Sequence, residues 1–149
     1  MRWKLGISSL VAAVVVAAPL AAQFGHPLKG TWSGDWGPNE SNRNRILLEF
    51  DWVGCAENNC RIVGTLNPGP DAAPLRNITL TPPDPFPGVV ANADKPWTLR
   101  FEADVKDEKG NVVRVTVDGK LDNLGAYRRR IHGNWTQGTV KGTFLAIRN

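Results

Sequence analysis

The chain has 149 residues, of which 42% are hydrophobic and 21% charged, and it carries a formal net charge of +4 at pH 7. This length suits a single domain with a modest core, and no linker to a second domain is apparent. Part of the excess positive charge lies in the first four residues. The high isoelectric point therefore does not indicate a nucleic-acid-binding protein.

Residues 1–22 are predicted to form a cleavable secretory signal peptide. Arg2 and Lys4 precede an uncharged stretch of Val, Ala and Leu that contains Pro19 near its end, which is the order typical of such a signal. An uncleaved membrane anchor is the alternative, because the apolar stretch only just reaches the length of a membrane span. Pro19 and the lack of positive charges directly after the stretch favour cleavage, which we place after Ala22.

Cleavage would leave residues 23–149 as one domain in the periplasm or outside the cell. Removing 22 of the 149 residues leaves 127. Arg2 and Lys4 leave with the signal peptide, so 16 basic residues face 14 acidic ones and the net charge falls from +4 to +2. No membrane contact is expected after cleavage.

Cys55 and Cys60 are the two cysteines, and in an exported chain they are most simply a disulfide. A metal site would need more ligands than two thiols, and a redox pair usually has tighter spacing. The bridge would close a very short loop and would therefore stabilise the fold by only about 2 kcal/mol.

Alternating apolar and polar residues, separated by Gly, Pro, Asn and Asp, predict eight β-strands and no helix after residue 28. We place the strands at residues 29–36, 45–52, 60–66, 75–81, 97–105, 112–121, 129–136 and 141–148. Residues 82–96 contain five prolines and are predicted to be a long loop. The fold class is therefore all-β, an eight-stranded antiparallel up-and-down β-barrel, with a two-sheet β-sandwich as the alternative.

The register of the fifth and sixth strands follows from charge. A register that sets Arg100 opposite Asp118 pairs opposite charges, whereas a shift by two residues sets Arg100 opposite Lys120. The first register is therefore predicted, and it leaves residues 108–110 as a loop with Gly110 at the position that favours a left-handed backbone.

The register of the last two strands follows from their turn. A two-residue turn at Gly138 and Thr139 places glycine first, as a type II′ turn prefers. Trp135 then lies opposite Gly142, and Phe144 lies opposite Gly133. The same register would oppose Arg129 to Arg148, so one of the two strands is expected to be shorter than the pattern indicates.

Two resemblances follow from short motifs. Gly30, Thr31 and Trp32 open the first strand and Arg148 closes the last, an arrangement that resembles the calycin pattern of lipocalins, avidin-like proteins and fatty-acid-binding proteins. The resemblance implies that the tryptophan plugs one end of the barrel, that the arginine packs across it, and that a central cavity holds a small molecule. The segments HPLKGTWSGDWG and NPGP also resemble uncharacterised exported bacterial proteins, which carry no function over to this chain.

No arrangement of side chains predicts catalysis or metal binding. His26 and His132 lack neighbours that would make a Ser-His-Asp or Cys-His site. The carboxylate pairs Glu49 with Asp51 and Glu102 with Asp104 lie on polar strand faces, so we interpret them as solvated. Asp35 lies between Trp32 and Trp36, and the sequence does not decide its role. We expect no enzymatic activity, no cofactor and no metal.

Arg128, Arg129 and Arg130 form the only basic run. Alternate residues of a strand face opposite ways, so the three cannot form one patch unless they lie in the preceding loop, and we interpret them as the solvated end of a strand. No nucleic-acid partner is expected.

Three tryptophans are the predicted ligand-binding residues. Trp36, Trp52 and Trp97 each lie at a strand end, where a barrel mouth would be, and their rings could stack on a sugar or an apolar molecule. The other two tryptophans of the domain, Trp32 and Trp135, are explained by core packing. The sequence thus predicts a secreted or periplasmic barrel that binds a small apolar or sugar-like ligand. The alternative is a protein-interaction or envelope-structural domain with a filled core.

Overall fold

The computed structural model describes residues 26–57, 59–83 and 95–149, and these consist of eight strands and one short 3-10 turn. The elements are β1 (Gly30–Asn39), β2 (Asn42–Val53), η1 (Cys55–Glu57), β3 (Arg61–Leu66), β4 (Ala73–Thr81), β5 (Trp97–Lys106), β6 (Val112–Asp122), β7 (Arg130–Gln137) and β8 (Val140–Arg148). Each strand coincides with a predicted one to within three residues at either end. The predicted signal peptide lies outside the described residues, as does most of the predicted loop over residues 82–96.

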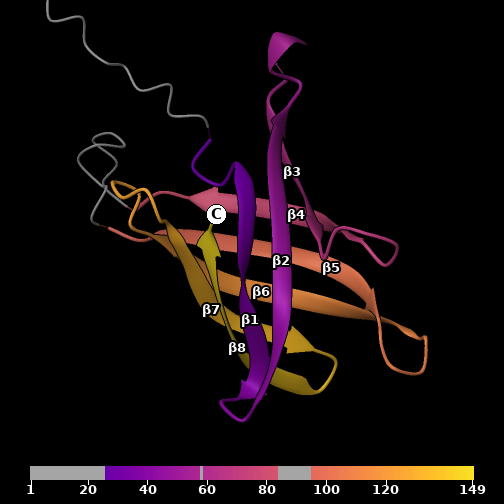
Figure 1. Cartoon of the computed structure of the whole chain (residues 1–149). Coiled ribbons are helices and arrows are strands. Elements are labelled where there is room, and N and C mark those ends of the chain that lie inside the picture. Colours follow the sequence, from indigo (N-terminus) through magenta and orange to yellow (C-terminus); the bar gives the residue numbers. More distant parts are fainter. Residues whose placement is uncertain (1–25, 58, 84–94) are drawn as a thin grey trace, which may run out of the picture.

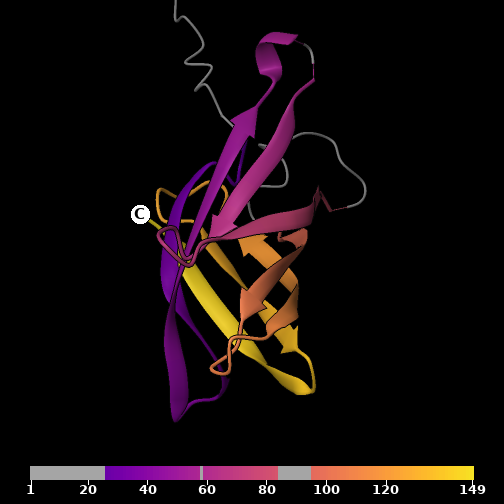
Figure 2. The same ribbon diagram turned by 90° about the vertical axis from the view of Figure 1, so that its right-hand side faces the viewer.

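The strands form one closed barrel (Figures 1 and 2). Each strand is antiparallel to its neighbours in sequence, and β8 pairs with β1 to close the sheet. The predicted up-and-down barrel is confirmed, and the sandwich alternative is wrong. Odd-numbered strands run one way and even-numbered strands the other. The last residues of odd strands therefore lie at the same barrel end as the first residues of even strands.

The predicted register of β5 and β6 is confirmed. Arg100 lies opposite Asp118 and Asp104 opposite Arg114, and both pairs are ion pairs, with N···O distances of 3.4 Å and 2.8 Å. Gly110 has a φ of +82°, which residues with a side chain adopt only with strain. Charge pairing and turn chemistry thus select the same register.

The predicted register of β7 and β8 is also confirmed. Trp135 lies opposite Gly142 and Phe144 opposite Gly133. Gly138 has a φ of +59° whereas Thr139 does not have a positive φ, as a type II′ turn requires. β7 begins at Arg130, one residue later than predicted, so Arg129 lies outside the strand, although Arg148 N still donates to Arg129 O at 3.0 Å.

The seam between β1 and β8 depends on a close approach of backbones. A side chain at Gly34 would collide with Leu145 O, and one at Gly142 would collide with Gly37 O. Arg43 of β2 reinforces the seam from outside, because it donates to Asp35 Oδ1 at 2.9 Å, to Gly37 O and to Thr143 O. Asp35, whose role the sequence does not decide, therefore holds Arg43, and Arg43 connects β1, β2 and β8.

The β2–β3 hairpin extends beyond the barrel (Figures 1 and 2). Cys55 and Cys60 lie at its tip in a disulfide, as predicted. β3 pairs with β2 along its whole length, but with β4 only at Thr65 and Leu66. The barrel wall is therefore least continuous between β3 and β4.

Inward apolar side chains form the core of the barrel. In β5 the buried residues Trp97, Leu99, Phe101 and Ala103 alternate with more exposed ones, as period-two sequence alternation requires. Facing strands contribute apolar side chains to the same interior, among them Leu48, Phe50, Leu75, Val117, Leu121 and Ile131.

Candidate functional site

One end of the barrel is closed by its own side chains. Trp32 has no exposed surface, and its indole Nε1 donates a hydrogen bond to Leu28 O at 2.8 Å. Leu28, which precedes β1, is also fully buried. Arg129 lies across the same end and donates to Leu124 O at 3.2 Å and to Pro27 O at 2.9 Å. These contacts tie the segment before β1 to the segment before β7.

Arg129 corrects one expectation and bears on another. It was interpreted as part of a solvated strand end, but it is half-buried, and desolvation together with the nearby charge of Arg148 lowers its pKa. Arg148, which the calycin resemblance assigned to this end, lies against Gly30, where a Cβ would be 3.0 Å from its Nε. Arg129 and Arg148 therefore both pack at the closed end of the barrel.

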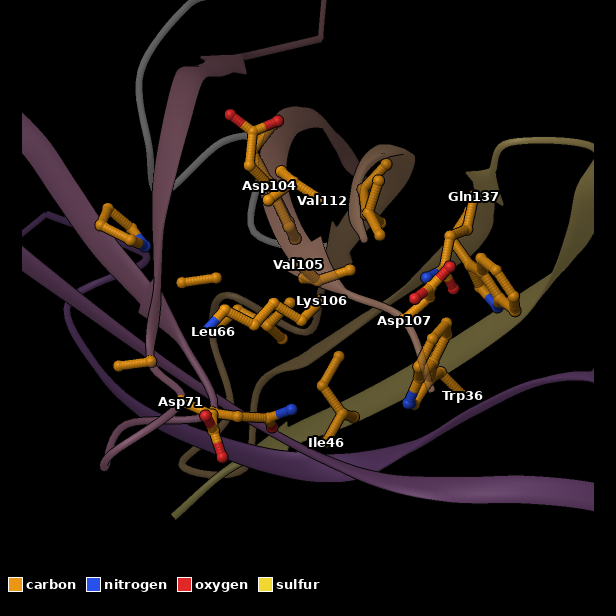
Figure 3. A pocket seen from close by; sticks show the side chains of 18 of the residues that line it. Trp36, Ile46, Leu66, Asp71, Asp104, Val105, Lys106, Asp107, Val112 and Gln137 are labelled. Carbon is orange, nitrogen blue, oxygen red and sulfur yellow. The ribbon is translucent and has the colours of Figure 1, made fainter. Parts of the chain in front are cut away.

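The opposite end of the barrel contains a cavity of about 870 Å³ (Figure 3). The loop between β3 and β4 and the loop between β5 and β6 contribute residues to its lining. Its inner wall is apolar and draws on all eight strands, with Ile46, Leu66, Phe101, Val117 and Phe144 as representatives. The size and the apolar wall are those of a small-molecule pocket.

Two tryptophans meet at this cavity. Trp36 of β1 and Trp135 of β7 pack edge to face, with ring centroids 4.2 Å apart and planes at 67°. Trp135 is buried, and its Nε1 donates to Thr143 O at 3.1 Å. Trp36 is only half-buried, and its Nε1 makes no hydrogen bond to another described residue. The two indoles thus differ in what they can offer to a bound molecule.

The local backbone brings Trp36 to this position. The β1–β2 register shifts between Trp36 and Asn39, so the strand ends in an irregularity directly after the tryptophan. Gly37 follows it and lies against the backbone of Asn42. Only a residue without a side chain fits this contact, and it fixes the strand end from which Trp36 reaches the cavity.

Some charged residues near the mouth of the cavity are already paired. Asp104 accepts from Arg114 Nε at 2.8 Å and lies 3.7 Å from Arg76 Nε, and the Arg114 guanidinium lowers the pKa of Asp104. Asp107 accepts from Lys109 N and Asn111 N within its own loop, and the hydrogen bonds from Asn111 lower its pKa. Both carboxylates therefore have structural roles.

Three exposed charged side chains remain at the mouth: Asp71, Lys106 and Glu108. None of them forms an ion pair with another described residue. Together with Asp107, they give the mouth three negative charges against one positive charge. A bound anion would therefore meet an unfavourable potential there.

The three tryptophans predicted as a ligand site do not converge. Trp36 lines the cavity. Trp97, 7% exposed, belongs to the core at the start of β5, and Trp52 lies on the projecting hairpin, where it stacks on His26 with ring centroids 4.3 Å apart. The residue that accompanies Trp36 is Trp135, for which the sequence predicts core packing.

Strand direction could have separated these tryptophans. Trp36 ends an odd strand, whereas Trp97 begins one and Trp52 ends an even one, so Trp36 lies at the other barrel end. Trp135 lies near the end of an odd strand and is thus at the same end as Trp36. The predicted up-and-down topology and strand bounds are therefore enough to place Trp36 and Trp135 at the same end of the barrel.

The described residues contain no group of three or more His, Cys, Asp or Glu side chains arranged to hold a metal ion. His132 faces outward, and its Nε2 lies 2.7 Å from Asp122 Oδ2, which also pairs with Arg130. In the parts of the chain that the structure describes, no helix is long and apolar enough to cross a membrane.

Comparisons with protein families, with curated proteins and with solved structures find no match for this chain. The chemistry of the cavity itself therefore carries the functional argument.

Proposed function

We propose that the protein is an exported, calycin-like barrel that binds a small, largely apolar molecule in the cavity between Trp36 and Phe101, and that it acts as a binding protein rather than an enzyme. The observation that carries the proposal is the contrast between a cavity of about 870 Å³ at one end and a side-chain plug at the other. A barrel of eight strands is just wide enough to hold one small ligand.

The wall chemistry favours an apolar ligand over a sugar. Phe101, Phe144 and Val117 of the inner wall offer no hydrogen bonds, so a sugar placed against them would leave hydroxyls unpaired, and the charged lining residues lie towards the mouth. A bicyclic aromatic molecule that buries about 200 Å² of apolar surface gains roughly 5 kcal/mol before the costs of association. We therefore expect dissociation constants of roughly 0.2 to 1 mM for simple aromatic probes.

Two observations support export. The Cys55–Cys60 disulfide is compatible with an oxidising compartment such as the periplasm. The order of charged and apolar residues in residues 1–22 is that of a signal peptide.

Titration with 1-aminoanthracene, a neutral planar fluorophore, tests the proposal. We expect its emission to rise on binding. The variant Val105→Trp adds an indole at a half-buried position in the cavity wall and should abolish the rise. Leu145→Trp adds the same group at an exposed position outside the cavity and should leave binding unchanged. Equal binding by both variants would exclude the cavity as the site.

A second candidate function is protein binding through the projecting β2–β3 hairpin. The observation that favours it is the edge of β3, where residues 61–64 pair with β2 and with no other described strand. Unpaired strand edges are sites at which extended segments of other proteins add. A stable partner retained by the intact protein, and lost when the hairpin residue Val63 is replaced by Pro, would support this function.

A further inference from the structure

The two indoles at the cavity have different hydrogen-bonding roles: the N–H of Trp135 is bound within the protein, and the N–H of Trp36 is available to a ligand. Trp135 donates to Thr143 O, a backbone group of β8, and that bond fixes its ring. Trp36 lies across it at 67° and lines the cavity, and its Nε1 has no partner among the described residues. Figure 3 shows the Trp36 nitrogen on the side of the ring that faces the cavity and Ile46.

An indole N–H is a donor only, so it can be satisfied within the cavity only by water or by an acceptor atom of a ligand. The surrounding wall is apolar, with Ile46 and Phe144 near Trp36. A donor in such surroundings discriminates strongly, because a molecule that displaces water without replacing its hydrogen bond leaves the donor unpaired.

Charge at the mouth restricts the ligand further. Arg76 and Arg114 form a cluster with Asp104 and Glu102 in which the formal charges cancel. The remaining charged lining residues are Asp71, Asp107 and Glu108 against Lys106 alone. A neutral or cationic molecule is therefore favoured over a carboxylate.

We propose that Trp36 is the residue that determines ligand specificity, because its Nε1 donates a hydrogen bond to a carbonyl or ring-nitrogen acceptor on a flat, uncharged or cationic aromatic ligand packed against Trp135. This inference rests on the proposed function, and it names the class of molecule that the cavity takes. Gln137 lines the same cavity, and its amide can offer a second polar contact.

Two probes of nearly equal shape test the proposal. 2-Acetylnaphthalene carries a carbonyl acceptor, whereas 2-isopropylnaphthalene has a methyl group in its place. Each is used to displace 1-aminoanthracene from the wild-type protein and from Trp36→Phe, which keeps an aromatic ring but removes the donor. The ratio of the two affinities is compared between the proteins, so that the different desolvation of the two probes cancels.

The preference for the acetyl compound should fall about fivefold in Trp36→Phe. The matched variant Trp52→Phe alters a tryptophan on the projecting hairpin, outside the cavity, and it should leave the ratio unchanged. 2-Naphthoate should displace the fluorophore more weakly than 2-acetylnaphthalene.

A second measurement, by nuclear magnetic resonance, uses only the wild-type protein and so does not depend on whether a variant folds. In the wild-type protein, the ¹H resonance of the Trp36 indole N–H should move downfield on binding of 2-acetylnaphthalene and not on binding of the isopropyl compound. If both naphthalenes bind and neither the ratio nor the resonance responds, the role of Trp36 is wrong while the binding function stands. If no probe binds the wild-type protein, the proposed function itself fails.

Discussion

The two ends of the barrel use the same residue type for opposite purposes. At the closed end, Trp32 is fully buried and its N–H is bound to Leu28 O. At the open end, Trp36 is half-buried, four residues further along the same strand, and its N–H has no described partner. One tryptophan therefore completes the core and the other is available to a ligand.

The difference arises from what precedes and surrounds each ring. Pro27 and Leu28 fold over the closed end and supply the carbonyls that Arg129 and Trp32 bind. At the open end the flanking loops supply Asp71 and Glu108, which line the mouth of the cavity and are exposed. The plug is thus built from chain segments outside the strands, and the pocket exists where no such segment among the described residues covers the barrel.

The largest predicted effect separates the two tryptophans by stability. Trp32→Ala should destabilise the protein by about 3–5 kcal/mol, because it leaves a large cavity in the core and unpairs Leu28 O. Trp36→Ala should cost less, about 2 kcal/mol, because the ring is only partly buried. Urea unfolding followed by circular dichroism measures both. Equal losses would contradict the division between a plugged and an open end.

The next effect concerns Arg129. Replacement by Met keeps the apolar stem but removes the donors to Leu124 O and Pro27 O, and should cost about 2 kcal/mol. Its exposed neighbour Arg128 provides the control, since Arg128→Met should change the free energy of unfolding by less than about 0.5 kcal/mol. Comparable values for the two variants would show that Arg129 is not part of the closure.

The disulfide should contribute less than the plug. The double variant Cys55→Ser, Cys60→Ser frees only the tip of the β2–β3 hairpin, so the loss should be at most about 2 kcal/mol in urea unfolding. Binding of 1-aminoanthracene should be unchanged, because neither cysteine lines the cavity. Loss of probe binding in a variant that remains folded would link the hairpin to the pocket.

The smallest effect is a dependence on pH near the closed end. Burial beside Trp52 lowers the pKa of His26, so folding favours the neutral ring. The stability that this provides is complete above the ordinary histidine pKa of about 6.5 and is lost as the pH falls through the lower, folded value. His26→Phe keeps a flat ring, and its thermal midpoint should decline less than that of the wild type between pH 7 and pH 5. Parallel declines would mean that His26 does not titrate in contact with the barrel.

The fold was predictable from the sequence because several local signals agree. The Arg100–Asp118 pair and the position of Gly110 select one register for β5–β6, and Gly138 selects one for β7–β8. These signals act between neighbouring residues or across one hairpin, so they can be recognised in the sequence without knowledge of the rest of the fold.

The site was only partly predictable, because its members come from distant strands. Trp36 was identified by its place at a strand end, but Trp97 shares that feature and lies in the core. For Trp135 the sequence predicts packing beside a glycine. The residue does lie opposite Gly142, and it also lines the cavity. The sequence pattern predicts a solvated Arg129, because no local pattern reveals its hydrogen bond to Pro27 O, 102 positions away in sequence.

A nuclear magnetic resonance titration of the wild-type protein with 2-acetylnaphthalene tests the central claim most directly. Shift changes should concentrate on Trp36, Trp135 and Phe144 and spare Trp32 at the plugged end. Changes that centre on Trp32 or on the β2–β3 hairpin, or none at millimolar probe, would contradict the assignment of the open end as a ligand site.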